Sequence, residues 1–199
     1  MAAHVTDEVC SDSLGRARTD RVKARFGRRA LCSAHMGGGE QALVCEVEIP
    51  KGGRNKYEYD PRLGGIKFDR LLVSAATYPT DYGYLRGTLG QDGDPLDALV
   101  CLHEPTFPGC LIPVKPLGMF KMRDDKGIDD KIICVPLHDP YWNKHETLED
   151  LPMLLRAEIE QFFSIYKDLE GKEVTTEGWR SLEEATKEIA AARERLRQR

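Results

Sequence analysis

Several common structural and functional signals are missing from this sequence of 199 residues. No apolar run approaches the roughly eighteen residues that a transmembrane helix needs, so we expect no membrane partner. The sequence has no N-x-[ST] glycosylation sequon, which removes one indication of secretion. It also lacks the Walker lysine loop, the G-x-G-x-x-G fingerprint and the zinc motif H-E-x-x-H. The function must therefore be sought in less familiar residue patterns.

The six cysteines do not form a recognisable metal site or disulfide framework. None belongs to a C-x-x-C pair, and their spacings do not fit a zinc site. Cys45, Cys101 and Cys134 each lie inside an apolar run, where free cysteine behaves as a small hydrophobic residue. This usage favours a reducing compartment, and we predict a cytoplasmic protein.

Composition indicates one folded domain preceded by a different N-terminal segment. The hydrophobic fraction of 41% is sufficient for a core, and the net charge of −4 argues against a general nucleic-acid binder. Residues 1–39 are basic, with seven Lys/Arg against four Asp/Glu, and end in Gly37-Gly38-Gly39. We predict that residues 1–39 are a disordered extension and that residues 40–199 form a single catalytic domain. An organelle transit peptide is disfavoured by the four acidic residues, and a translation start at Met36 is a further alternative.

The pattern from residue 42 onward predicts a mainly β fold with flanking helices. Short strands are expected at 42–49, 57–59, 66–71, 97–103, 111–122 and 132–135. Many short strands separated by turns favour a small closed barrel. Pro113 and Pro116 suggest that the 111–122 run is an edge strand or contains a bend. Two helices are expected in the last quarter, one after Pro152 and one opened by a capping box at Ser181.

Three carboxylates stand within six residues in the stretch Asp92-Gly93-Asp94-Pro95-Leu96-Asp97, which we call the aspartate loop. Because Asp94 precedes a proline, its backbone favours an extended conformation, and Asp92 and Asp94 then point to the same face. Like charges this close repel one another, which predicts a cation among them. Carboxylates and water are the ligands of Mg²⁺. A calcium-binding EF-hand is excluded, because its Gly and Glu positions hold Asp97 and His103.

Further charged groups accompany this loop. A second acidic stretch covers 124–130, and Glu48 and Glu58 add carboxylates on early strands. Cationic and phenolic side chains are interleaved with them, namely Lys56, Arg70, Tyr82, Lys131, Tyr166 and Lys167. Taken together, the two kinds of group describe a site for several divalent metals and a multiply anionic substrate. Such a site suits phosphoryl transfer, where catalysis depends on positioning and charge neutralisation.

The aspartate loop sequence D-G-D-P-L-D resembles the signature of the soluble family I inorganic pyrophosphatases. The resemblance extends from about residue 42 to the C-terminus, through the segments 48–50, 55–58, 68–70, 78–84, 129–131 and 162–170. It implies a five-stranded closed β-barrel of the OB type packed by two C-terminal α-helices. It also implies Mg²⁺-dependent hydrolysis of inorganic pyrophosphate to two orthophosphates, and a homo-oligomer in which a hexamer is favoured over a dimer.

The resemblance also implies roles for individual residues. Asp92, Asp97 and Asp129 correspond to ligands of the tightest metal, with Asp97 bridging to a second one. Asp124 and Asp129 correspond to holders of a metal that arrives with the substrate, and Glu48 and Glu58 to acidic groups around a further metal. The phosphate-contacting groups correspond to Lys56, Arg70, Tyr82, Lys131, Tyr166 and Lys167. Asp94 is the candidate general base for in-line attack by a metal-bridged hydroxide.

Two other functions remain open at this point. Tyr78, Tyr82 and Tyr84 are candidate stacking platforms for single-stranded nucleic acid, although the barrel part of the chain is net acidic. A different metal-dependent phosphoesterase, acting on an ester, is the second alternative.

Overall fold

The structure is a computed structural model that describes residues 42–125 and 127–199. The predicted N-terminal extension, residues 1–39, lies outside the described residues. The strands are β1 Leu43–Ile49, β2 Asn55–Asp60, β3 Gly65–Leu71, β4 Asp81–Leu85, β5 Asp97–Val100, β6 Leu111–Asp124, β7 Gly127–Ile128, β8 Lys131–Pro136 and β9 Thr175–Arg180. The α-helices are α2 Met153–Ile165 and α3 Leu182–Arg197, and the short 3₁₀ helices are η1 Leu148–Asp150 and η2 Asp168–Glu170.

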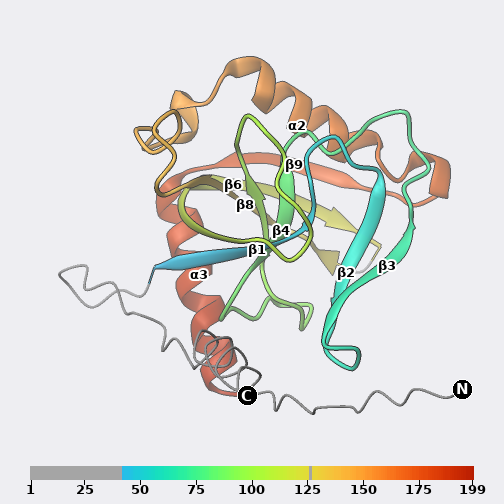
Figure 1. Ribbon diagram of the computed structural model, residues 1–199, viewed down its shortest axis with the longest axis horizontal. Helices are drawn as coiled ribbons and strands as arrows, with labels where there is room; N and C mark the ends of the chain where they lie inside the picture. The colour runs from blue at the N-terminus through green and yellow to red at the C-terminus, as the bar shows by residue number, and fades with distance from the viewer. Residues whose placement is uncertain (1–41, 126) are drawn as a thin grey trace, which may run out of the picture. The chain divides into compact units, whose positions relative to one another are not determined.

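Five strands close into a ring, and this confirms the predicted mainly β fold with two C-terminal helices. The strands follow the order β1-β4-β5-β8-β6, and β6 pairs back onto β1. Gly83 of β4 lies where β1 comes closest, because a Cβ there would stand only 2.0 Å from the carbonyl oxygen of Glu46. In Figure 1 the ring occupies the centre of the molecule, with α2 across one side and α3 running behind it.

Two neighbouring strands of the ring, β5 and β8, run parallel to each other. Theirs is the only parallel pairing among the described strands. Their side chains alternate between two cores. Leu99 and Ile133 face the core that contains α2, whereas Ala98 and Ile132 face the core that contains α3. Burial on both faces explains why these strands are continuous apolar runs in the sequence rather than alternating ones.

Strand β6 is a highly connected element of the sheet and not an edge strand. It pairs with β1, β8, β7 and β9 along its 14 residues. The bend that the prolines suggested is present, because the register against β8 shifts between Pro116 and Gly118. A strand with two prolines can remain central here because it changes partners along its length, and the bulge takes up the ladder irregularity.

A separate two-stranded hairpin, β2–β3, stands beside the ring (Figure 1). Its register places Lys56 opposite Arg70 and Glu58 opposite Lys67. The hairpin exposes large apolar side chains such as Phe68, which is 55% exposed. Both strands agree with the predicted positions, and the hairpin carries three of the predicted site residues, Lys56, Glu58 and Arg70.

Both predicted helices are present. Pro152 is the N-cap of α2, which buries Ile159, Phe162 and Phe163. The capping box of α3 is formed, with the Ser181 hydroxyl accepting a hydrogen bond from the Glu184 amide at 3.3 Å. Among the described residues, no helix is long and apolar enough to cross a membrane.

Two details of the C-terminal part differ from the sequence pattern. Leu196 follows Ala185 and Ile189 at helical spacing, yet it is 41% exposed, whereas Ala192 is buried. The strand β9 was not predicted. Its sequence, Thr175-Thr176-Glu177-Gly178-Trp179-Arg180, has a glycine in its middle and little alternation, so it forms by pairing with β6.

Candidate active site

The centre of the candidate site is a buried lysine between two aspartates. Parallel pairing places Asp97 of β5 opposite Lys131 of β8. The Lys131 ammonium, only 2% exposed, lies 2.5 Å from an Asp97 oxygen and also contacts the Asp129 carboxylate. The Tyr82 hydroxyl of β4 donates a hydrogen bond to the same Asp97 oxygen. Three neighbouring strands of the ring, together with the residues just before β8 that include Asp129, therefore bring these four groups to one point.

The electrostatics of this group leave negative charge in excess. Burial by itself would lower the pKa of Lys131, but Asp97 and Asp129 outweigh it and hold the pKa above its usual value. Burial raises the pKa of Asp97, and repulsion from Asp129 adds to the effect while Lys131 opposes it. One ammonium cannot balance the two half-buried carboxylates of Asp97 and Asp129, so the geometry favours a further cation.

Asp92 joins Asp97 and Asp129 around a small cavity of about 20 Å³. Its lining also includes Asp130 and Glu188. Within residues 42–125 and 127–199, no three His, Cys, Asp or Glu side chains converge tightly enough to hold a metal ion by themselves. Asp97 and Asp129 are instead paired with the Lys131 ammonium. A set of hard carboxylate oxygens around a water-sized space nevertheless fits Mg²⁺, which uses few protein ligands and retains water.

A second cation–carboxylate group follows α2. The Lys167 ammonium lies 2.6 Å from an Asp124 oxygen and 3.9 Å from an Asp125 oxygen. The preceding residue, Tyr166, is 5% exposed. Its pKa is raised by burial and by the charges of Asp129 and Asp124, so these carboxylates lie near it. The second acidic stretch is thus joined electrostatically to the first.

The third group lies on the β2–β3 hairpin. Lys56 pairs with Glu58 and lies 3.8 Å from Asp69. Arg70 donates two hydrogen bonds to the Glu170 carboxylate, at 3.1 Å and 2.9 Å. The hairpin is therefore tied to η2 by a bidentate ion pair, which fixes the orientation of the guanidinium.

Glu48 connects the hairpin to the ring. Its carboxylate, at the end of β1, accepts a hydrogen bond from the Tyr59 amide at 2.8 Å. Burial raises the pKa of Glu48 to about 7 against the opposing effect of that hydrogen bond. The charges of Asp97, Lys56 and Glu58 also act on it, so Glu48 lies within electrostatic reach of both parts of the site.

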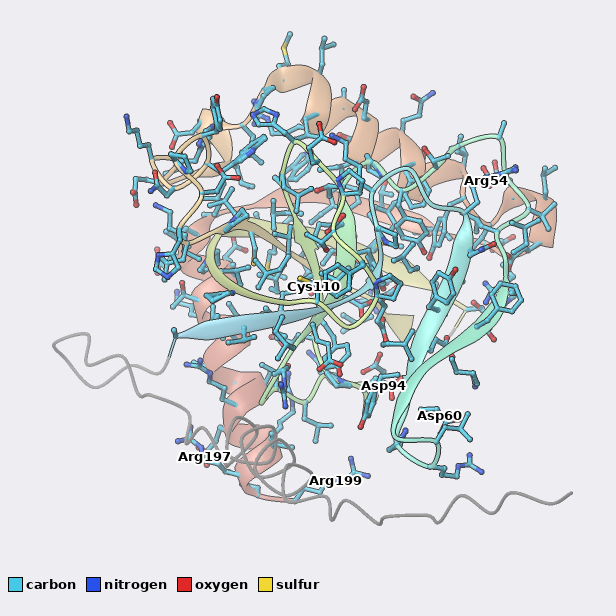
Figure 2. All side chains as sticks on the ribbon, in the orientation of Figure 1. Arg54, Asp60, Asp94, Cys110, Arg197 and Arg199 are labelled. Atoms are coloured by element: carbon cyan, nitrogen blue, oxygen red, sulfur yellow. The ribbon has the colours of Figure 1, made fainter. Side chains whose placement is uncertain are left out.

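The structure thus brings most of the predicted residues into neighbouring groups. Asp94 differs, because it does not line the cavity formed by Asp92, Asp97 and Asp129. It lies in the loop that precedes β5, where Figure 2 labels it. Tyr78 and Tyr82 are 2% and 9% exposed, so they are not open stacking platforms for nucleic acid.

Sequence reasoning did not select Glu170 and Glu188 as site residues. Glu170 follows Lys167 by three residues within a single turn, and this spacing could have indicated that Glu170 lies near the site. Glu188 lines the cavity from the middle of α3, on a helix surface that also carries several other acidic residues. No pattern in the sequence distinguishes it from those neighbours.

Comparison with known proteins gives the family. The family model described as inorganic pyrophosphatase matches residues 45–197. The inorganic pyrophosphatase of Methanosarcina mazei is 54% identical over 157 residues, which cover 78% of this chain and 93% of the relative. That of Streptomyces coelicolor is 51% identical over 152 residues, covering 76% and 93%.

Solved structures agree with the sequence comparison. The inorganic pyrophosphatase of Thermus thermophilus superposes with a TM-score of 0.77 at 41% identity, covering 81% of this chain and 95% of that one. The Coxiella burnetii enzyme gives a TM-score of 0.75 at 40% identity, with coverage of 81% and 99%. This chain therefore belongs to the inorganic pyrophosphatase family.

Proposed function

We propose that this protein hydrolyses inorganic pyrophosphate to two orthophosphates and requires Mg²⁺. The observation that carries the proposal is the convergence of Asp92, Asp97 and Asp129 on one cavity beside the buried ammonium of Lys131. Family membership supports the same reaction. The carboxylates suit metal ions, and the neighbouring cations suit a small, densely charged anion.

Magnesium held by Asp92, Asp97, Asp124 and Asp129, with Glu48 and Glu58 around it, would supply charge neutralisation and activation of water. The side chains of this chain have distinct tasks. Lys56, Arg70 and Lys167 bind phosphate oxygens, and the carboxylates that now pair with them hold their orientation. Tyr82, Lys131 and Tyr166 present polar atoms from buried side chains, so their positions are fixed before substrate binds.

Asp94 is proposed as the general base. It stands in the aspartate loop, and its exposed carboxylate makes none of the contacts that tie Asp97 and Asp129 to Lys131. A carboxylate that is not consumed by another partner remains able to take a proton from attacking water. Attack in line on one phosphorus then transfers charge to the leaving phosphate, which the lysine and arginine groups stabilise.

We further propose a cytoplasmic homo-oligomer, with a hexamer favoured over a dimer. The free, buried thiols of Cys45, Cys101 and Cys134 are consistent with a reducing compartment. The compact length of the portion that matches the family, residues 45–197, is the reason for favouring the hexamer.

The deciding experiment measures orthophosphate release from pyrophosphate with and without Mg²⁺. We expect rapid release that depends on the metal, and little release from a phosphomonoester under the same conditions. Faster hydrolysis of the ester would assign the site to the alternative phosphoesterase, and no release from either compound would reject a hydrolytic function. Binding of oligonucleotides at moderate salt tests the remaining alternative, and we expect none.

A further inference from the structure

The aspartate loop is held from outside the ring by helix α3. Leu89, three residues before Asp92, uses both of its backbone polar groups in this contact. Its amide donates to the Ala192 carbonyl at 3.0 Å, and its carbonyl accepts from the Arg195 Nε at 2.8 Å. Arg195 reaches Leu89 across 106 positions of sequence.

The position of Leu89 determines where the carboxylates point, because the turn that follows is tight. The Gly90 amide donates to the Asp94 carbonyl at 2.6 Å, and the Asp94 amide donates to the Asp92 carboxylate at 3.1 Å. A Cβ at Gly90 would stand 2.7 Å from that same Asp92 oxygen. Gly93 has a φ of +96°, which only glycine adopts without strain. These hydrogen bonds connect the turn that carries Asp92 and Asp94 to Gly90, the residue that follows Leu89.

Packing holds the far end of the loop, where Leu96 is buried and its amide donates to the Thr88 hydroxyl at 3.0 Å, but the segment with Asp92 borders open space. On one side is the cavity of about 20 Å³ that Asp92 shares with Asp97 and Asp129. On the other is an open hollow of about 400 Å³, lined by Leu89, Gly93 and Arg195 among others. The hydrogen bonds from α3 are therefore the contacts that act directly on the Leu89 end of the loop, which carries Asp92.

Arg195 also touches the site through a second partner. Its guanidinium lies 2.5 Å from the Glu188 carboxylate, one further wall of the smaller cavity. The Arg195 and Glu188 side chains are 30% and 22% exposed, so the pair is partly shielded from solvent. One guanidinium thus links a cavity carboxylate to the backbone that precedes the aspartate loop.

We propose that Arg195 is a positioning residue for magnesium binding: by holding the Leu89 carbonyl, it presents Asp92 to the ion that Asp97 and Asp129 share. The inference rests on the proposed function, because it concerns the metal of that same site. Arg195 itself touches neither metal nor substrate. Its effect is to limit the positions that the Asp92 carboxylate visits before the ion binds.

The test compares Arg195→Gln with Arg197→Gln, which removes the same charge from the same helix. Arg197 is a matched control because its side chain is 71% exposed and pairs only with Glu194 at 3.0 Å among the described contacts. Mg²⁺ binding is measured by calorimetry without substrate, and hydrogen exchange is followed in the peptide spanning residues 86–96. We expect Arg195→Gln to weaken binding about tenfold, equivalent to about 1.4 kcal/mol, and to speed exchange in that peptide.

A kinetic split separates positioning from general destabilisation. At saturating Mg²⁺ we expect the kcat of Arg195→Gln to stay within about threefold of the parent, since binding energy and not chemistry is lost. Unchanged Mg²⁺ affinity in the folded variant would overturn the proposal, even if its melting temperature fell. Pyrophosphate hydrolysis by the parent protein, assayed in the same buffer, tests the proposed function independently of this result.

The double variant Arg195→Gln/Glu188→Gln excludes a purely electrostatic role. If Arg195 only neutralised Glu188, Arg195→Gln would leave a further unpaired carboxylate at the cavity and tighten Mg²⁺ binding, and the double variant would return to the parent affinity. Either result would overturn the proposal. We expect instead that the double variant binds Mg²⁺ as weakly as Arg195→Gln, because the Leu89 carbonyl remains without its donor.

Discussion

Replacement of Glu48 by glutamine should stabilise the metal-free protein at neutral pH while impairing its activity. The Glu48 carboxyl accepts the Tyr59 amide hydrogen bond, and a glutamine oxygen of the same shape can accept it too. The substitution removes only the charge. Burial raises the Glu48 pKa from 4.5 to about 7, so its charged form is disfavoured in the folded protein.

The sign of the pH dependence follows from this shift. Below about pH 4.5 Glu48 is protonated in both the folded and the unfolded chain, and the charge has no effect on stability. As the pH rises toward 7 the unfolded chain ionises first, and the free energy of unfolding falls. The shift from 4.5 to about 7 corresponds to at most about 3 kcal/mol. Because Glu48 keeps some solvent contact, we expect about 2 kcal/mol.

Urea unfolding in the presence of a chelator measures this effect. The difference in unfolding free energy between Glu48→Gln and the parent should be near zero at low pH and should grow to about 2 kcal/mol at about pH 8. Glu158→Gln, on the exposed face of α2, is the control and should show no such growth. Added Mg²⁺ should stabilise the parent more than Glu48→Gln, because the cation attracts the charged Glu48 carboxylate and not the neutral amide. A constant difference across the pH range would refute the account of Glu48.

Three further predictions concern the chemistry and the fold. Asp94→Asn should keep Mg²⁺ affinity but lose about a hundredfold or more in kcat, and near-normal turnover would remove Asp94 from the base role. Calcium should inhibit pyrophosphate hydrolysis, because it prefers more ligands at longer distances than Mg²⁺; full rates with Ca²⁺ alone would contradict the proposed metal geometry. Gly118→Ala should destabilise the fold by about 1–3 kcal/mol, since a Cβ there meets Leu148 at 2.5 Å and the Arg180 carbonyl at 2.6 Å. Calorimetric melting checks this, and an unchanged melting temperature would show that the bulge in β6 relaxes freely.

The sequence predicts the barrel well where local pattern and tertiary context agree. β1 alternates because one face is more buried than the other, and α3 begins at a capping box that the structure forms. β9 could not be predicted, because Gly178 and Thr176 give it little strand preference of their own. Its ladder exists only because β6 offers it a partner. The central position of β6 in the sheet could not be predicted either, because its prolines indicated only a bend.

The site shows the same division. Residue types and spacing indicated carboxylates that attract metal, because three aspartates in six residues need a counter-charge. They gave no indication that Lys131 would lie between Asp97 and Asp129, since that contact depends on parallel pairing of β5 and β8. Glu188 and Arg195 act from a helix far along the chain. Contacts of this kind require the fold to be known.

The contact between Asp97 and Lys131 forms only when β5 and β8 pair in the observed register. If β8 slipped by one position against β5, every side chain on it would change faces, and the ammonium would enter the opposite core. Ile132 would then stand beside a carboxylate, and a charge would lie among apolar groups. A misaligned molecule would therefore be unstable as well as inactive, so quality control that removes unfolded chains would also remove the incompetent ones.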